Sequence, residues 1–399
     1  MFFVKYPILK SIKIFLYSNM RVNEGRVTIK IPSFDKVSSK APVFYNPSME
    51  LNRDISVLAI QQFQKEKKSK IKIADLFAGS GIRGIRYRLE IEGTERVLAN
   101  DINPIAVEFI KRNSELNKAP VDITMEDANI LLRKNRGVFD VVDIDPFGTP
   151  SPFIESAGYS LKDGSLLCVT ATDTSSLCGT YKKPCIRKYN AVPLKTEYCH
   201  ENGLRILTGF ISLTLAKYKK YIKARLAYSS QHYMRLYLEI GKGASKTDKS
   251  LKDNIGFIYH CHNCLFRSLE HGLLPILPRE CPQCSEKLDF SGPLWIGELE
   301  DENFIKGMIR SLPEKKLNKK RNILKLLKLL KGESGMPPTF YDTHKVCSKM
   351  RISAPPLKKI IKTLQEKGFK ATRSHCKATG IKTNAPIIRL KESIKEVYS

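Results

Sequence analysis

DLFAGSGIRG, at residues 75–84, follows directly on the apolar run IKIA of residues 71–74. Its glycines at 79, 81 and 84 form a G-x-G-x-x-G pattern, which is typical of a turn that leads from a strand into a helix and lets the backbone approach a ligand closely. The candidate cofactor-binding residues of this stretch are Asp75, Gly79 and Gly81. A glycine turn without a ligand can give the same pattern, so the stretch indicates the fold class and leaves the ligand open.

Apolar runs alternate with amphipathic stretches on both sides of this turn. Strands are predicted over residues 71–77, 96–99, 121–125, 139–144 and 164–170. A helix is predicted over residues 104–117, because Pro104 takes the position that proline favours in a first helical turn. This alternation is typical of an α/β fold. We therefore predict an α/β, Rossmann-like domain over residues 20–240.

Acidic residues follow the second and third predicted strands. Asp101 comes at the end of the second strand, where a carboxylate accepts hydrogen bonds from ribose hydroxyls. Asp127, followed by Ala128, comes just past the third strand, in a position to meet an adenine ring. Each aspartate alone could equally be a helix N-cap. Their ordered placement instead favours a nucleoside ligand that lies across the strand ends.

The fourth strand distinguishes between a dinucleotide and S-adenosylmethionine. It leads into DIDPFG at residues 143–148, and methyltransferases that act on exocyclic amino groups carry a short acid-or-amide, proline, aromatic loop at this place. A carboxylate that accepts the N–H bonds of an aromatic amine makes its nitrogen more nucleophilic, so Asp145 is the catalytic candidate. Phe147 offers a face on which an extruded base can stack. In isolation, D-P-x-G would be an ordinary turn.

The charge balance predicts a polyanionic partner. Lys and Arg number 68 against 40 Asp and Glu, which gives a net charge of +28. This excess favours nucleic acid first and a membrane surface second, since a heat-adapted lysine-rich surface would carry matching glutamates. Residues 1–17 are too short and too charged to span a membrane, and Met20 is expected as an alternative start. No membrane association and a cytoplasmic location are expected.

Two close cysteine pairs predict a metal site. Cys261 and Cys264 form one C-x2-C pair, and Cys281 and Cys284 form another after residues 265–280, which is the spacing of a four-cysteine zinc site. Four thiolates close the coordination shell, so the zinc is expected to be structural. The other cysteines are expected to be core or surface thiols. We predict a linker or an exposed loop at residues 241–254 and a zinc-binding segment at residues 255–300.

The C-terminal residues are basic and helical in pattern. Residues 315–331 carry apolar side chains at helical spacing beside many lysines, and residues 343–375 read as helix, turn, helix and then a strand from near Gly368. This order suggests a winged-helix-like region within a module at residues 301–399. The candidate RNA contacts are basic and aromatic residues in two sets: Lys182, Lys183, Arg187 and Lys188 with Tyr181 and Tyr189, and Lys370, Arg373, Lys377 and Lys382.

Together these motifs resemble those of the tRNA (guanine-26-N2)-dimethyltransferase family of archaea and eukaryotes. The resemblance covers nearly the whole chain after about residue 25. Its motifs are VFYNP at residues 43–47, NRD at 52–54, DLFAGSGIRG at 75–84, NDINP at 100–104, DIDPFG at 143–148, TATDT at 170–174 and the paired cysteines.

The resemblance implies a class I methyltransferase domain, S-adenosylmethionine as the donor, and mono- and then dimethylation of the N2 amine of guanosine 26 in tRNA. Carried over by motif, Arg53, Arg83, Asp101, Asp127 and Ala128 contact the cofactor, and Asp145 acts on the guanine amine. The two arginines suit the carboxylate of the cofactor, which arginine binds through two parallel hydrogen bonds. A monomer without an obligate protein partner is expected.

Two other functions compete with this one. The same pocket would serve another amino methyltransferase that acts on ribosomal RNA or on adenine in DNA. Alternatively, the chain is a non-enzymatic zinc-ribbon protein that binds RNA and carries a degenerate cofactor fold. The latter predicts no donor binding and no effect of replacing Asp145.

Overall fold

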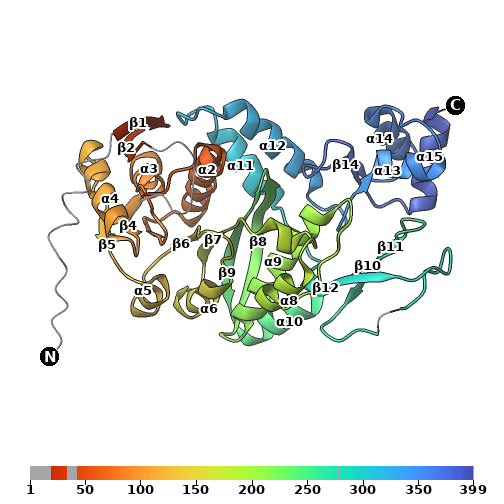
Figure 1. Cartoon of the computed structure of the whole chain (residues 1–399), viewed down its shortest axis with the longest axis horizontal. Coiled ribbons are helices and arrows are strands. Elements are labelled where there is room, and N and C mark those ends of the chain that lie inside the picture. Colours follow the sequence, from red (N-terminus) through yellow and green to blue (C-terminus); the bar gives the residue numbers. More distant parts are fainter. Residues whose placement is uncertain (1–18, 34–42, 277, 399) are drawn as a thin grey trace.

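A seven-stranded sheet lies at the centre of the computed structural model, which describes residues 19–33, 43–276 and 278–398 (Figure 1). In order across the sheet, the strands are β5 (Asp122–Thr124), β4 (Thr94–Asn100), β3 (Ile71–Asp75), β6 (Val141–Ile144), β7 (Ser165–Ala171), β9 (Tyr233–Lys242) and β8 (Lys220–Ser230). The pairs from β5 to β7 are parallel, whereas β9 is antiparallel to both β7 and β8. The five predicted strands and the predicted α/β fold are confirmed.

The order of the strands reverses at β3. The chain runs outward from β3 through β4 to β5, and then returns to the other side of β3 for β6 and β7. Ligands of open α/β sheets bind at the carboxyl ends of the strands where the order reverses. The ends of β3, β4 and β6 therefore define the expected site.

Helices cover both faces of the sheet because neighbouring strand residues point to opposite sides. Ile73 and Val141 pack on one face, whereas Ala74 and Val142 pack on the other. The first face is covered by α2 (Glu50–Lys67), α3 (Ile82–Glu90), α11 (Glu302–Ser311) and α12 (Lys320–Glu333). The second face is covered by α5 (Ala128–Lys134), α6 (Ser151–Ser160) and α9 (Cys199–Ala216).

A β-hairpin lies over the start of the domain. It consists of β1 (Asn19–Glu24) and β2 (Val27–Pro32) and packs on α3 and on α4 (Pro104–Leu116), which confirms the predicted helix. Asn113 and Asn117 accept hydrogen bonds from the β2 backbone at 2.8 and 2.9 Å. The hairpin brings Glu24 into the interior, which matters for the site below.

Residues 241–254 are not a linker. They contain α10 (Ala244–Asn254), which buries little more than Thr247 and therefore shows no apolar period. A second sheet follows, formed by β10 (Ile255–His260), β11 (Arg267–His271) and β12 (Asp289–Trp295). Gly209 of α9 lets β12 approach, since a Cβ there would lie 2.8 Å from the Trp295 nitrogen. The second sheet thus shares the main core.

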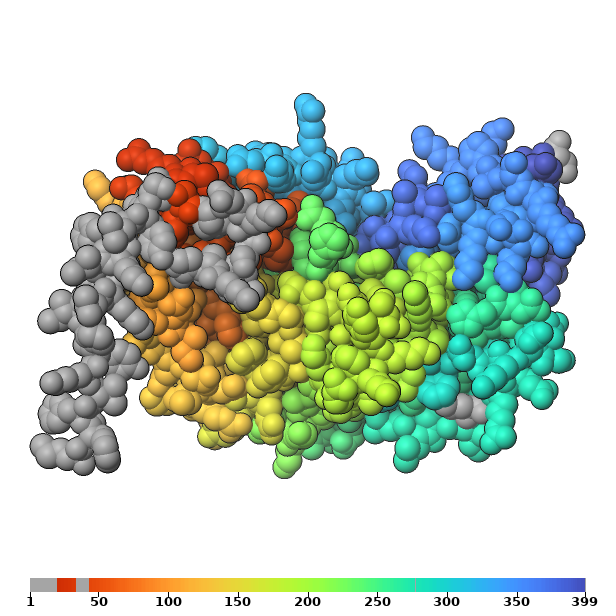
Figure 2. Space-filling model, viewed as in Figure 1, coloured from red at the N-terminus to blue at the C-terminus, as the bar shows by residue number. Residues whose placement is uncertain are grey.

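The C-terminal residues form a small module with its own core at one end of the molecule (Figures 1 and 2). Its elements are β13 (Tyr341–Asp342), α13 (Thr343–Met350), α14 (Leu357–Glu366), β14 (Ala371–Arg373), β15 (Gly380–Thr383) and α15 (Ile387–Tyr398). The predicted helix, turn, helix and strand are confirmed. Helices α11 and α12, in contrast, pack on α2 of the central domain.

The expected short, charged segment at residues 1–17 lies outside the described residues. Among the described helices, none combines the length and the apolar character that a bilayer crossing requires.

Candidate active site

A cavity of about 320 Å³ opens at the carboxyl ends of β3, β4 and β6. Its volume lies in the range of small-molecule sites, which is about 300–1,000 Å³. Six of the residues singled out from the sequence line it: Arg53, Gly79, Arg83, Asp101, Asp145 and Phe147. The fold thus brings together residues from four separate motifs at the switch point of the sheet.

The glycine turn forms the floor of this cavity. Gly79 and Gly81 have φ angles of 54° and 81°, which glycine adopts without strain. A Cβ on Gly79 would lie 3.1 Å from the Phe44 carbonyl oxygen. A larger residue therefore fits at this position only with difficulty. Gly81 faces Ile110 of α4 and does not line the cavity.

Asp101 lies beside the turn with its carboxylate already oriented. Its Oδ2 accepts a hydrogen bond from the Gly79 nitrogen at 2.8 Å, and its Oδ1 accepts one from the Asn103 nitrogen at 2.9 Å. Each carboxylate oxygen can accept a further bond. Burial raises the pKa of Asp101 above its ordinary value, against these backbone hydrogen bonds. The carboxylate is therefore held where it can accept hydrogen bonds from ligand hydroxyls.

Asp101→Ala is expected to weaken S-adenosylmethionine binding about tenfold or more, because hydrogen bonds to a charged group contribute about 1.5–3 kcal/mol. Isothermal titration calorimetry measures the dissociation constant. Asp122→Ala is the matched control, since Asp122 is exposed and is the first residue of β5, at the end of the strand that points away from the site. Equal dissociation constants for Asp101→Ala and the unaltered chain would remove Asp101 from the site.

Asp145 and Arg83 form an ion pair at the edge of the cavity. The Arg83 guanidinium also donates to Asn52 Oδ1 at 3.0 Å and to Ser56 Oγ at 3.1 Å, both on α2. Phe147, two residues beyond Asp145, is 54% exposed, and its ring centroid lies 4.3 Å from that of Phe44 in an edge-to-face arrangement. The loop after β6 thus presents one carboxylate and one aromatic ring to the opening, and Phe44 adds a second ring from the segment before α2.

A buried ion-pair network lies beneath this loop. Arg235 of β9 donates two hydrogen bonds to Asp143 at 2.7 and 2.8 Å, and both side chains are fully buried. Tyr87 donates to the same carboxylate at 2.5 Å. Burial raises the pKa of Asp143, but Arg235 and Arg83 outweigh it, so the pKa lies below its ordinary value. Arg235 was not predicted from the sequence, because a single arginine in an apolar strand belongs to no motif.

Arg53 lines the cavity but is paired within the chain. Its guanidinium donates to both carboxylate oxygens of Glu24 at 2.7 and 2.5 Å, and Tyr45 donates to Glu24 at 2.7 Å. Arg86 lies 3.3 Å from the same carboxylate. Glu24 was not predicted from the sequence either, because it meets Arg53 only through the fold of the β1–β2 hairpin, which packs on α3.

Three other candidates lie outside the residues that line the cavity. Asp75 is buried behind the glycine turn, and burial raises its pKa to about 7. Asp127 is the N-cap of α5 and accepts hydrogen bonds from the backbone nitrogens of Asn129 and Ile130 at 2.9 and 3.2 Å. Ala128 is the buried first residue of that helix. Asp127 thus has a capping role in the fold.

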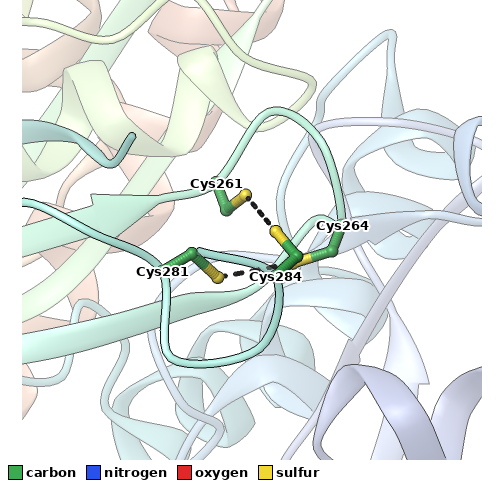
Figure 3. Close-up of side chains that lie close together, drawn as sticks. All are labelled: Cys261, Cys264, Cys281 and Cys284. Atoms are coloured by element: carbon green, nitrogen blue, oxygen red, sulfur yellow. Dashed lines mark hydrogen bonds between the residues drawn. The ribbon is translucent and has the colours of Figure 1, made fainter. Parts of the chain in front are cut away.

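The four predicted zinc ligands converge at the end of the second sheet (Figure 3). Their sulfur atoms all lie within 4.8 Å of one another, and the Cys261–Cys284 and Cys264–Cys281 sulfurs are each 3.5 Å apart. Zinc–sulfur bonds of about 2.3 Å in a tetrahedron separate the sulfurs by about 3.8 Å. The four side chains therefore fit a tetrahedral cation.

Some of the candidate RNA contacts are exposed and others are buried. Helix α8 (Lys182–Tyr189) presents Lys182, Lys183 and Arg187 to the surface, with Tyr181 59% exposed beside them. Tyr189 is wrong as a stacking candidate, because it is buried and donates to Asp173 at 2.6 Å. Lys382 is also wrong, because it is 1% exposed and is bonded to Glu201 at 2.8 Å.

The seven-stranded sheet, the cavity at its switch point and the Asp-Pro-Phe loop define a class I, S-adenosylmethionine-dependent methyltransferase. The family model of N2,N2-dimethylguanosine tRNA methyltransferases matches residues 25–395. The chain belongs to this family.

Individual relatives agree with the family match. The chain is 55% identical to the tRNA (guanine(26)-N(2))-dimethyltransferase of Methanobrevibacter smithii, over 96% of this chain and 99% of that one. It is 39% identical to the tRNA (guanine(26)-N(2)/guanine(27)-N(2))-dimethyltransferase of Aquifex aeolicus, over 94% and 96%. The structure of Trm1 from Pyrococcus horikoshii with S-adenosyl-L-methionine is similar, with a TM-score of 0.85 and 38% identity over 94% of this chain and 99% of that one.

Proposed function

We propose that this chain methylates the N2 amine of guanosine 26 in tRNA once and then a second time, with S-adenosylmethionine as the donor. One observation carries the proposal: Asp145 and Phe147 line the same cavity as the glycine turn. The family match and the relatives named above support the substrate. The name of the Aquifex relative also includes guanine 27, so the nucleoside analysis described in the Discussion is directed at position 26.

Asp145 is the proposed catalytic residue. S-adenosylmethionine supplies a methyl group on a positively charged sulfur. Asp145 accepts an N–H bond from the guanine amine, which raises the electron density on nitrogen and stabilises the positive charge that develops there. Transfer otherwise depends on alignment, which the fixed Arg83 contact and the rigid Pro146 provide. For the second methylation, the monomethylated nitrogen still carries one N–H for the same acceptor.

Phe147 and Phe44 are the proposed base-binding surface. Their rings meet edge to face at the mouth of the cavity, and Phe147 is the more exposed of the two. A guanine that leaves its stack in tRNA loses contacts that an aromatic face can replace. The pair therefore suits a flat base that enters next to Asp145.

We assign the cofactor contacts by position. Asp101 accepts hydrogen bonds from the ribose, and Arg53 and Arg83 lie where they can meet the cofactor carboxylate. Asp127 and Ala128 follow β5, next to the end of β4, and are the proposed adenine contacts. Asp75 precedes the turn, Gly81 belongs to it, and neither lines the cavity; we propose that both act by shaping the turn.

The four cysteines are the proposed ligands of one structural Zn²⁺. Four thiolates leave no open position for a substrate, which distinguishes this site from a catalytic zinc site. Arg267, which follows the second of these cysteines closely, stacks 3.8 Å from the Tyr341 ring centroid and donates to the Phe340 carbonyl oxygen at 2.6 Å. A zinc at the cysteines would thus fix the sheet against which the C-terminal module packs.

The tRNA surface is proposed to include the exposed residues of α8 and the basic module. The division into residues 20–240, 255–300 and 301–399 stays a prediction. Since α11 and α12 pack with the catalytic core, we propose that residues 341–398 are the part of the module that meets tRNA. A monomer and a cytoplasmic location are also proposed.

Labelled donor tests the substrate class. The purified chain is incubated with methyl-labelled S-adenosylmethionine and, separately, with tRNA, ribosomal RNA or DNA. We expect label in tRNA alone. Label in ribosomal RNA or DNA would favour the other amino methyltransferase, and no label in any pool together with no donor binding would favour the non-enzymatic alternative.

A further inference from the structure

A second group of metal-type donors lies outside the residues that line the cofactor cavity. Cys178 follows α7 (Thr174–Leu177), and Cys199 and His200 are the first two residues of α9. The two sulfurs and a ring nitrogen of His200 all lie within 4.8 Å of one another. We propose that Cys178, Cys199 and His200 bind a thiophilic divalent cation, for which Zn²⁺ is the natural choice.

The spacing of these donors matches what such a cation requires. The Cys199 sulfur lies 3.8 Å from the His200 Nδ1 atom. Tetrahedral zinc separates a sulfur from an imidazole nitrogen by about 3.5 Å, given bond lengths of about 2.3 and 2.0 Å. A small closure of the three side chains is therefore enough to place a metal between them.

Charge and burial also favour a cation here. Two thiolates would neutralise a divalent ion in a site where Cys178 is only 8% exposed. Cys199 opens an 18-residue helix, whose N-terminal backbone groups favour the thiolate form of a cysteine. A disulfide between Cys178 and Cys199 would leave His200 without a role. It would also remove the two negative charges that a divalent ion requires.

An ion can reach the group from solvent. His200 lines a surface cavity of about 510 Å³, together with His375 and Cys376 of the loop after β14. Cys185, in contrast, is a fully buried thiol of the same core and belongs to neither group of donors. It therefore provides a matched control.

A metal at this group would connect the active site to the core. Helix α7 begins two residues after Thr172, which lines the cofactor cavity and accepts a hydrogen bond from the Gly148 nitrogen at 2.8 Å. Gly148 ends the Asp-Pro-Phe loop. The ion would hold the end of α7 at the start of α9. It would thereby stabilise Thr172, directly after the end of β7, to which the Asp-Pro-Phe loop is hydrogen-bonded.

The number of zinc ions bound per chain tests the proposal directly. The full chain is purified under reducing conditions with Zn²⁺, freed of loosely bound metal by gel filtration, and analysed for zinc per chain by mass spectrometry. We expect His200→Ala and Cys199→Ser each to hold one equivalent less than the unaltered chain, and Cys185→Ser to hold as much. Because the result is a difference, it does not depend on how much zinc the four-cysteine site retains.

Cobalt gives a second readout that a purely structural role would not change. In the Co²⁺-loaded chain, His200→Ala should lose a set of thiolate charge-transfer bands while the bands of the four-cysteine site remain. Equal zinc content and equal cobalt spectra in His200→Ala and the unaltered chain would overturn the proposal. His200 is partly exposed, so its variant is expected to fold even if Cys199→Ser does not.

Discussion

Asp145→Ala is expected to lower kcat for methyl transfer to tRNA by about a hundredfold or more, while S-adenosylmethionine binding is retained. Removal of one preorganised polar group that stabilises developing charge typically lowers kcat by about 10²–10³-fold. The cavity that would hold the donor is otherwise lined by α2, the glycine turn and Asp101, all of which stay intact. Steady-state kinetics with tRNA and calorimetry with the donor separate the two effects.

Asp145→Asn sharpens this test. Its amide retains a carbonyl oxygen that can accept the N–H bond, so it should keep more activity than alanine. Asp163→Ala is the matched control, since Asp163 is exposed and lies before β7, away from the carboxyl ends of the strands. Turnover by Asp145→Ala equal to that of the unaltered chain would exclude Asp145 as the acceptor.

Arg235→Met is expected to reduce the free energy of unfolding by about 3 kcal/mol or more. Arg235 and Asp143 are both fully buried, and loss of one partner from a buried ion pair typically costs about 3–5 kcal/mol. Asp143 would retain Tyr87 and the more distant Arg83 guanidinium at 3.5 Å, but not its two short bonds to Arg235. Urea unfolding of the variant and the unaltered chain measures the difference.

The double variant with Asp143→Asn and Arg235→Met identifies the cause. It removes the unpaired charge, so it should recover a large part of the lost stability. A loss below about 1 kcal/mol in the single variant, or no recovery in the double variant, would show that the pair does not carry this energy.

Local patterns predicted five of the seven strands of the central sheet, but not β8 or β9, and six of the residues that line the cavity. The five parallel strands follow from apolar runs, and the cavity residues Gly79, Asp101 and Asp145 follow strands whose carboxyl ends must meet at one edge of the sheet. The four cysteines followed from their spacing alone. In each case the residue belongs to a short motif whose local geometry is the same wherever it occurs, so its position in the chain indicates its role.

Contacts between distant segments were not predictable in the same way. Glu24 of the N-terminal hairpin is bonded to Arg53, and Arg235 of β9 is bonded to Asp143 beneath the loop; neither belongs to a motif. Lys382 looked like a surface cation because the charge of a residue does not reveal its burial, whereas Glu201 and Glu333 are brought to it only by the tertiary fold. Helix α10 was missed because its exposed faces leave no apolar period.

Mass spectrometry of the nucleosides of treated tRNA tests the central claim most directly. Unmodified tRNA is incubated with the purified chain and S-adenosylmethionine, and fragments that contain position 26 are analysed. We predict N2-methylguanosine at early times and N2,N2-dimethylguanosine later, and neither in tRNA that carries adenosine at position 26. Methylation of another atom or base, with guanosine 26 unmodified, would contradict the account.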